Sequence, residues 1–320
     1  MSSHRNAFPS LTVIIAAYNH FEWLRLVLEG LRHQTVAPSQ IIIADDGSNA
    51  DTVDRIKQYI ADHPQMHILH LWHPDEGWRK NIILNKAVAA AKGEYLCFLD
   101  ADCIPAPRWA EDHLRLARPH TVIASRRSTF APWMNEKWEA TTSLSPDWFK
   151  HLRRDFMRNY FRFPSHTHPS RIIRLPIVRG KGLLQRTTGN LIGCNFGLWR
   201  RDLLDINGFD ERYLGPGLGE DIDIAWRIRF NGCSIEKVPH QAITIHRNHP
   251  SSMTSVSSPT YNPGILDQTK AERLTYTPYG INKPASDSSQ KAEKQKSPKV
   301  KVETQLSPAR KPSHFLRPQG

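Results

Sequence analysis

The chain has 320 residues, of which 39% are hydrophobic and 9% aromatic, so it can bury one large core or two modest ones. Four cysteines without a C-x-x-C pair exclude a disulfide-rich scaffold and favour a reducing, cytoplasmic compartment. The net charge of +12 comes mainly from two segments: residues 126–186 hold 13 Lys or Arg against 4 Asp or Glu, and residues 283–320 hold 9 against 3.

Residues 1–9 are predicted to be a flexible N-terminus, and the apolar run that follows is too short for a signal peptide or a membrane span. From there to about residue 125, short apolar runs alternate with amphipathic segments. The apolar runs lie at 12–18, 40–48, 66–72 and 94–102, and the helical patterns lie at 21–32, 52–60 and 80–91. This alternation predicts β-α-β units, and therefore an α/β fold with a mostly parallel sheet flanked by helices.

Polar residues follow three of the predicted strands: Tyr18 and Asn19, then the D-D-G-S segment at 45–48, then Asp100 and Asp102. If the strands are parallel, these ends lie along one edge of the sheet, where α/β folds bind their ligands. Asp100 and Asp102 are two positions apart, so they face the same side of a strand and can converge on one ligand. Two carboxylates suit Mg²⁺ or Mn²⁺ on a diphosphate, although an isolated D-x-D is more often an ordinary solvated strand end.

The basic segment at 126–186 departs from the alternation and is predicted to be a helical insertion. Ser145 and Pro146 suit the N-cap and the first turn of a helix. Apolar and aromatic residues then recur every four positions among cationic ones: Trp148, Leu152, Phe156 and Tyr160. Three interpretations stay open: a helix that packs its aromatic face on the sheet, an interfacial helix on anionic lipid, or a lid that binds an anionic glycan.

The last segment, residues 251–320, is polar and interrupted by prolines. Such a sequence buries too little apolar surface to offset the entropy of ordering, so it is predicted to be a disordered basic tail. Its cations, together with those of 126–186, make a peripheral contact with an anionic membrane one hypothesis for the chain.

Taken in order, the motifs resemble family 2 glycosyltransferases, which have the GT-A fold. IIAAYN, ADDGS, GWRKNIILNKA and FLDAD resemble the nucleotide-sugar-binding half of that family, here residues 10–125. GCNFGLWRRDLLDINGFDERY and GLGEDIDIAWR resemble the acceptor half, here residues 187–250, and are especially similar to bacterial chondroitin polymerases and to the galactosyltransferase-type C-terminal region. The resemblance implies one GT-A domain over residues 10–250, with the basic insertion between its halves.

The resemblance also implies a donor site. Asp46 matches the aspartate that hydrogen-bonds the nucleotide base, although the D-D-G-S segment by itself also fits an Asx turn. Arg79 stands at the family's basic position, where a guanidinium contacts the nucleotide or its diphosphate. Tyr18 and Asn19 would line the nucleotide pocket, unless they only form a strand-to-helix turn. Asp100 would reach the ribose or, through water, the metal.

For the chemistry, the resemblance assigns Asp221 as the base and Glu220 as a residue that orients the acceptor. Without the upstream motifs, the same pair is explained as an acidic cap of the helix that follows. The resemblance gives Asp102, Asp100 and His246 as ligands of Mn²⁺ or Mg²⁺, whereas a lone histidine is often only structural.

The sequence thus predicts an inverting, metal-dependent glycosyltransferase that acts on a nucleotide-sugar donor, UDP-galactose or UDP-N-acetylhexosamine. Its acceptor would be a hydroxyl of a glycan or glycolipid in the synthesis of cell-surface polysaccharide or lipopolysaccharide, in the cytoplasm or at the inner membrane face.

Two alternative functions fit the sequence less well. A sugar nucleotidyltransferase usually carries a glycine-rich basic loop after its first strand, and AAYNHFEWLR has no glycine. A nucleic-acid-binding protein would need a recognisable reading module, and none is found, so no nucleic acid partner is expected.

Overall fold

A computed structural model of the chain describes residues 8–162, 172–175, 187–188, 191–215, 220–249 and 261–283. All of these residues belong to a unit that ends at Lys283. Residues 1–7, most of the predicted flexible N-terminus, lie outside the described residues, as do parts of the basic segment and of the tail.

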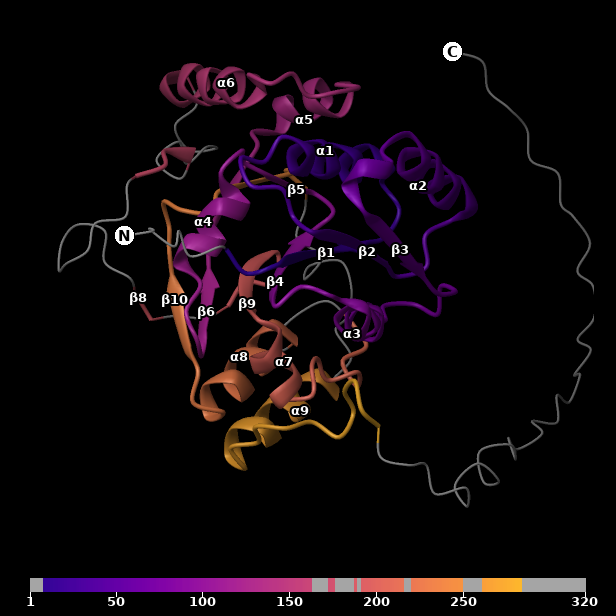
Figure 1. Cartoon of the computed structure of the whole chain (residues 1–320), viewed down its shortest axis with the longest axis vertical. Helices are drawn as coiled ribbons and strands as arrows, with labels where there is room; N and C mark the ends of the chain where they lie inside the picture. The colour runs from indigo at the N-terminus through magenta and orange to yellow at the C-terminus, as the bar shows by residue number, and fades with distance from the viewer. Residues whose placement is uncertain are drawn as a thin grey trace, which may run out of the picture. The chain divides into compact units, whose positions relative to one another are not determined.

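An eight-stranded sheet forms the centre of the fold (Figure 1). In spatial order its strands are β3 (Ile68–Trp72), β2 (Gln40–Asp45), β1 (Leu11–Ala17), β4 (Tyr95–Asp100), β9 (Asn195–Trp199), β6 (Thr121–Ala124), β10 (Ser234–Lys237) and β8 (Thr187–Thr188). β9 runs antiparallel to both of its neighbours and β8 is antiparallel to β10, whereas the other strands share one direction. The predicted mostly parallel α/β sheet is therefore confirmed.

Helices cover both faces of this sheet. On one side lie α1 (Phe21–Arg32), α2 (Ala50–Asp62) and α4 (Trp109–Leu116), and on the other lie α3 (Lys80–Ala90), α7 (Arg200–Asp205) and α8 (Glu220–Phe230) (Figure 1). A short 3₁₀ turn, Pro64–Met66, leads into β3. Because strand residues alternate between faces, Val13 packs with Trp23 of α1 while its neighbour Ile14 packs with Ile83 of α3. Strands covered on both sides are continuously apolar, as the fully buried β2 shows.

A second, three-stranded sheet lies beside the first and joins distant parts of the chain. Its order is β5 (Cys103–Pro105), β11 (Thr244–His246) and β7 (Arg127–Thr129). In the register of the first two strands, His246 is opposite Cys103, which brings the end of the D-A-D segment to the histidine of the second half. The basic segment thus begins with a strand of this sheet, so the predicted insertion is tied to the domain at its N-terminal end.

The rest of the described basic segment is helical, with α5 (Pro132–Glu139) followed by α6 (Trp148–Arg162). Trp148, Leu152 and Phe156 are buried, and the Trp148 ring lies 6.2 Å from the ring of Trp138 in α5. The apolar face of α6 therefore packs against α5 and against Phe130, whose ring lies 5.8 Å from that of Phe156. The side chain of Tyr160 and residues 163–171 and 176–186 lie outside the described part of the chain.

The prediction of disorder from residue 251 onwards is wrong for residues 261–283. This segment contains α9 (Tyr261–Ala271), which buries Ile265 and Leu266 beside α8. The hydroxyl of Thr269 donates to Asp223 of α8 at 2.7 Å. Buried polar contacts also hold the segment, since the hydroxyl of Thr277 donates to Asp210 at 2.7 Å, and such contacts have no signature in the sequence. Residues 250–260 and 284–320 are outside the described residues.

In the part of the chain that the structure describes, no helix is long and apolar enough to cross a bilayer.

Candidate functional site

The carboxyl ends of β1, β2 and β4 meet at one edge of the large sheet. In the strand register, Ala17 pairs with Asp45 and Ala16 pairs with Asp100. The polar residues that follow these strands therefore share one edge, as their positions in the sequence predicted. The polar side chains at this edge form three hydrogen-bonded groups, which surround Asp46, Asp102 and Asp221.

Asp46 is almost fully buried and its carboxylate accepts two hydrogen bonds. Its Oδ1 lies 2.8 Å from Nε2 of His73, and its Oδ2 accepts the backbone N–H of Arg79 at 2.9 Å. Burial raises the pKa of Asp46 above its usual value, although the bond from His73 opposes this. The turn of D-D-G-S is closed by its neighbour instead, since Asp45 Oδ1 accepts the N–H of Ser48 at 2.8 Å.

Three other predicted donor residues, Tyr18, Asn19 and Arg79, belong to the segments next to Asp46. Tyr18 is half exposed and its hydroxyl donates to Asp75 at 2.9 Å. Asn19 has a positive φ of 54°, and its Oδ1 accepts the N–H of Asn49 at 3.0 Å, which joins the turn after β1 to the start of α2. The guanidinium of Arg79 donates to the carbonyl of Trp78 at 3.2 Å.

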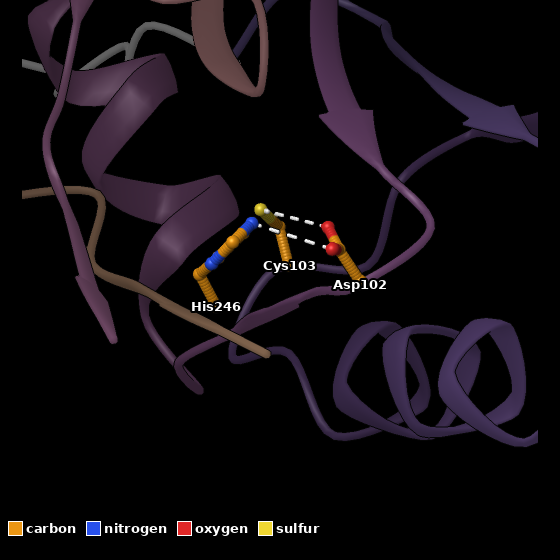
Figure 2. Close-up of side chains that lie close together, drawn as sticks. All are labelled: Asp102, Cys103 and His246. Atoms are coloured by element: carbon orange, nitrogen blue, oxygen red, sulfur yellow. Dashed lines mark hydrogen bonds and ion pairs between the residues drawn. The ribbon is translucent and has the colours of Figure 1, made fainter. Parts of the chain in front are cut away.

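The second group surrounds Asp102 (Figure 2). Its Oδ2 lies 3.3 Å from Nε2 of His246 and 3.0 Å from Nε2 of His249. The thiol of Cys103 lies 3.6 Å from its Oδ1. One ligand atom from each of Asp102, Cys103 and His246 fits within 4.8 Å of the others. Strand β11 thus supplies imidazole nitrogen to the end of the D-A-D segment.

The chemistry of this group fits a hard or borderline cation. Burial lowers the pKa of His246 to about 4, so the imidazole is neutral at pH 7, and its Nδ1 is a buried atom with no hydrogen-bond partner among the described residues. Burial raises the pKa of Cys103 well above its usual value and keeps it a thiol. Burial also opposes ionisation of Asp102, but His249 and neighbouring charges lower its pKa overall. A carboxylate with neutral imidazole suits Mn²⁺.

Asp100 lies in the third group instead of the Asp102 cluster. Its Oδ1 accepts from the ammonium of Lys80, at the start of α3, at 2.8 Å. Burial opposes the charge of Lys80, yet Asp100 and Asp221 together raise its pKa. Lys80 therefore provides positive charge between a strand end of the first half and a helix start of the second.

Asp221 lies in the first turn of α8 and is partly buried. Its Oδ2 accepts the backbone N–H of Gly193 at 2.8 Å. Partial burial raises the pKa of Asp221, with Lys80 opposing the shift and Asp100 adding to it. A Cβ on Gly193 would approach Asp221 Oδ1 to 2.2 Å, so only glycine leaves room for the carboxylate there. Glu220 directly precedes it at the helix start, a position that also suits the helix dipole.

Sequence reasoning missed His73, Lys80 and His249 as parts of this edge. Each has a weak signal in the sequence: His73 follows the third strand, Lys80 stands next to Arg79 in G-W-R-K-N, and His249 comes three residues after His246. The motif predicts a role for Arg79, whereas in the structure the neighbouring Lys80 forms an ion pair with Asp100.

Comparison with protein families gives two overlapping matches. Residues 12–205 match the family model described as glycosyl transferase family 2, and residues 184–250 match the model described as the N-terminal domain of galactosyltransferase.

Individual relatives and solved structures agree with these matches. Validoxylamine A glucosyltransferase of Streptomyces hygroscopicus subsp. limoneus is 23% identical over 84% of this chain and 63% of its own length. Chondroitin synthase of Escherichia coli is 22% identical over 75% of this chain and 35% of its own length. The chain thus spans less than two thirds of each relative.

Among solved structures, GalNAc-T7 with UDP, GalNAc and Mn²⁺ superposes with a TM-score of 0.59 at 14% identity, covering 82% of this chain and 48% of that one. This likeness shows that the predicted GT-A fold is present. Because the first family model spans more than half of the chain, the chain belongs to glycosyl transferase family 2.

Proposed function

We propose that the chain transfers a sugar from a nucleotide-sugar donor to a hydroxyl of a glycan or glycolipid, with inversion at the anomeric carbon. The observation that carries this proposal is the division of one sheet edge into an Asp102–His246 group suited to a cation and an Asp221 carboxylate with a raised pKa. A reaction that releases a charged diphosphate and deprotonates a hydroxyl requires both.

Asp221 is the proposed base. A carboxylate whose pKa is raised takes a proton from an acceptor hydroxyl more readily than an ordinary surface aspartate does. The N–H of Gly193 fixes one of its oxygens, which holds the carboxylate in place for the attacking hydroxyl. Glu220, one residue earlier, would orient the acceptor.

Asp102 and His246 are the proposed holders of Mn²⁺ or Mg²⁺, which when bound would neutralise charge on the leaving diphosphate. His249 contacts the same carboxylate oxygen and would complete or orient this set. Asp100 remains a proposed contact to the ribose or, through water, to the metal. Its ion pair with Lys80 also holds the ammonium of Lys80 between the two halves of the site.

Asp46, Tyr18, Asn19 and Arg79 are the proposed contacts to the nucleotide. Asp46 already accepts two hydrogen bonds, so a base N–H would add to a carboxylate held in position by His73 and the Arg79 backbone. We infer a UDP donor carrying galactose or N-acetylhexosamine, in keeping with the UDP and GalNAc named in the GalNAc-T7 structure and with the chondroitin synthase relative.

The proposed acceptor belongs to a cell-surface polysaccharide or lipopolysaccharide. Helix α6 exposes a cationic surface next to an apolar side chain: Arg153, Arg154, Met157 and Arg158. This composition suits peripheral contact with an anionic membrane that carries a glycolipid acceptor.

The test is a calorimetric titration of UDP-, GDP-, CMP- and dTDP-linked sugars into the full-length protein, with and without Mn²⁺. We expect a UDP-sugar to bind only with metal, and turnover with an acceptor to release UDP. Tight binding of every nucleotide irrespective of Mn²⁺, or no binding at all, would contradict the proposal.

A further inference from the structure

A second cluster of metal-ligating side chains lies at the edge of the large sheet opposite the site described above. His120 immediately precedes β6, Cys233 immediately precedes β10, and Asp202 belongs to α7, which follows β9. Since β6 and β10 begin where β9 ends, the three segments meet at the amino ends of the parallel strands. The glycosyltransfer chemistry proposed above uses none of these residues.

The three side chains are close enough to share one ion. One ligand atom from each lies within 4.8 Å of the other two, and His120 Nδ1 is 3.0 Å from Asp202 Oδ1. The backbone also ties these segments together, because the carbonyl of His120 accepts the N–H of Ser234 at 2.9 Å. His120 and Cys233 each directly precede a strand and Asp202 lies in a helix, so regular elements hold all three segments in place.

The burial of the cluster leaves one polar atom unsatisfied. Asp202 is 2% exposed, and its Oδ2 accepts no hydrogen bond from any described residue. A buried carboxylate oxygen without a donor is unfavourable and calls for a water or an ion. Cys233 is also buried, whereas the side chain of His120 is 66% exposed, so an ion could enter from solvent on the histidine side.

We propose that His120, Asp202 and Cys233 form a Zn²⁺ site separate from the Mn²⁺ or Mg²⁺ site of the transferase. Zn²⁺ binding would release the thiol proton of Cys233 to solvent. The resulting thiolate, with the imidazole and the carboxylate, forms a mixed S, N and O donor set that Zn²⁺ binds tetrahedrally, whereas Mn²⁺ prefers oxygen ligands. Water would fill the fourth position on the exposed side of His120. Such an ion clamps the starts of β6 and β10 to α7 and stabilises the second half of the sheet.

The test uses Co²⁺ as a spectroscopic substitute for Zn²⁺ in the full-length protein carrying Asp102→Ala, which removes the central carboxylate of the other site. A bound Co²⁺ with a cysteine ligand shows a thiolate charge-transfer band in the near ultraviolet. We expect this band to be displaced by Zn²⁺, to vanish with Cys233→Ser and to persist with Cys103→Ser. No such band, or a band that follows Cys103 and survives Cys233→Ser, would overturn the proposal.

A second variant guards against misfolding. His120 has a positive φ of 53°, which asparagine tolerates, and it is exposed, so His120→Asn removes the imidazole without disturbing the core. We expect it to weaken Zn²⁺ binding by at least about tenfold, while the metal-free melting temperature falls only slightly through loss of the contact with Asp202. The matched control is His151→Asn on the exposed face of α6, which should bind Zn²⁺ like the parent. Equal Zn²⁺ affinity in the His120 and His151 variants would contradict the site.

Discussion

The Asp102 group and the Asp221 group lie at one edge of the same sheet, yet the pKa of Asp102 is lowered and the pKa of Asp221 is raised. Burial opposes ionisation in both. Around Asp102, hydrogen bonding from His249 and neighbouring positive charge lower the pKa. Around Asp221, the nearby Asp100 adds to the effect of burial and the pKa rises in spite of Lys80. Asp102 is therefore favoured as an anion, as the proposed metal site requires, whereas Asp221 has the higher proton affinity that the proposed base requires.

The difference comes from which chain segments face each carboxylate. Asp102 lies next to β11, in which His246 pairs with Cys103, and His249 follows three residues after that strand. Asp221 is at the start of a helix, where it faces Gly193 and the ion pair of Lys80 with Asp100. Among the described residues, no imidazole is shown in contact with it. Neighbours from distant parts of the chain, more than burial alone, therefore decide which role each aspartate can take.

The largest expected effect comes from Asp221→Asn. It removes the proposed proton acceptor but keeps the shape of the side chain, so kcat should fall by about 10²–10⁴-fold while UDP affinity is retained. Initial rates and calorimetry with UDP measure the two quantities. Asp267→Asn, the same change at an exposed position of α9, serves as the control. Unchanged turnover would remove Asp221 from the role of base.

Next in size is Gly193→Ala, which moves Asp221 without changing its chemistry. The added Cβ would lie 2.2 Å from Asp221 Oδ1, so the carboxylate must shift. A displacement of this kind in a reacting group can cost about 10²-fold in kcat. Gly264→Ala is the control, because a Cβ there meets no atom within 4 Å. Parallel loss of UDP binding and kcat would indicate general misfolding and not a displaced base.

Asp102→Ala tests the other side of the comparison. Removing the carboxylate that contacts both histidines should lower the Mn²⁺ affinity, and with it the affinity for UDP, by at least about 10–100-fold. Mn²⁺ titrations at fixed UDP measure this. His249→Ala should give a smaller loss in the same direction, and His151→Ala should give none. An unchanged Mn²⁺ requirement in the Asp102 variant would refute its assignment as a ligand.

Much of the fold and of the donor edge could be predicted from the sequence. Short apolar runs between helical patterns specify parallel strands, and polar residues directly after those strands must share an edge, as Asp46 and Asp100 do. Such predictions need only local periodicity and a general rule of sheet topology.

The partners of these residues could not be predicted in the same way. His249 reaches Asp102 across 147 residues of sequence and Gly193 reaches Asp221 across 28, and no periodicity records contacts of this kind. The order in residues 261–283 was missed for a related reason, since it depends partly on buried polar contacts such as those of Thr269 with Asp223 and of Thr277 with Asp210. Polar contacts between residues far apart in the sequence therefore require the structure to be identified.

The smallest and sharpest effect is expected from Lys80→Met, which changes the charge around Asp221 and leaves the carboxylate itself in place. Lys80 lowers the pKa of Asp221 and neutralises Asp100, so its loss should raise the pKa of Asp221 further. The base must be unprotonated, so activity is lost as pH falls through this pKa. The acid limb of the pH–rate profile should therefore move to higher pH, by about 1–3 units.

This shift distinguishes an electrostatic role of Lys80 from a structural one. Lys80→Arg keeps the positive charge and should restore the parent profile, while Lys86→Met, an exposed position on the same helix, should leave it unchanged. If Lys80→Met lowers kcat equally at every pH, the ammonium supports the position of Asp100 and does not tune the base. If the acid limb moves and the rate at high pH recovers, Lys80 limits the rise in the pKa of Asp221 and thereby keeps the proposed base unprotonated over a wider pH range.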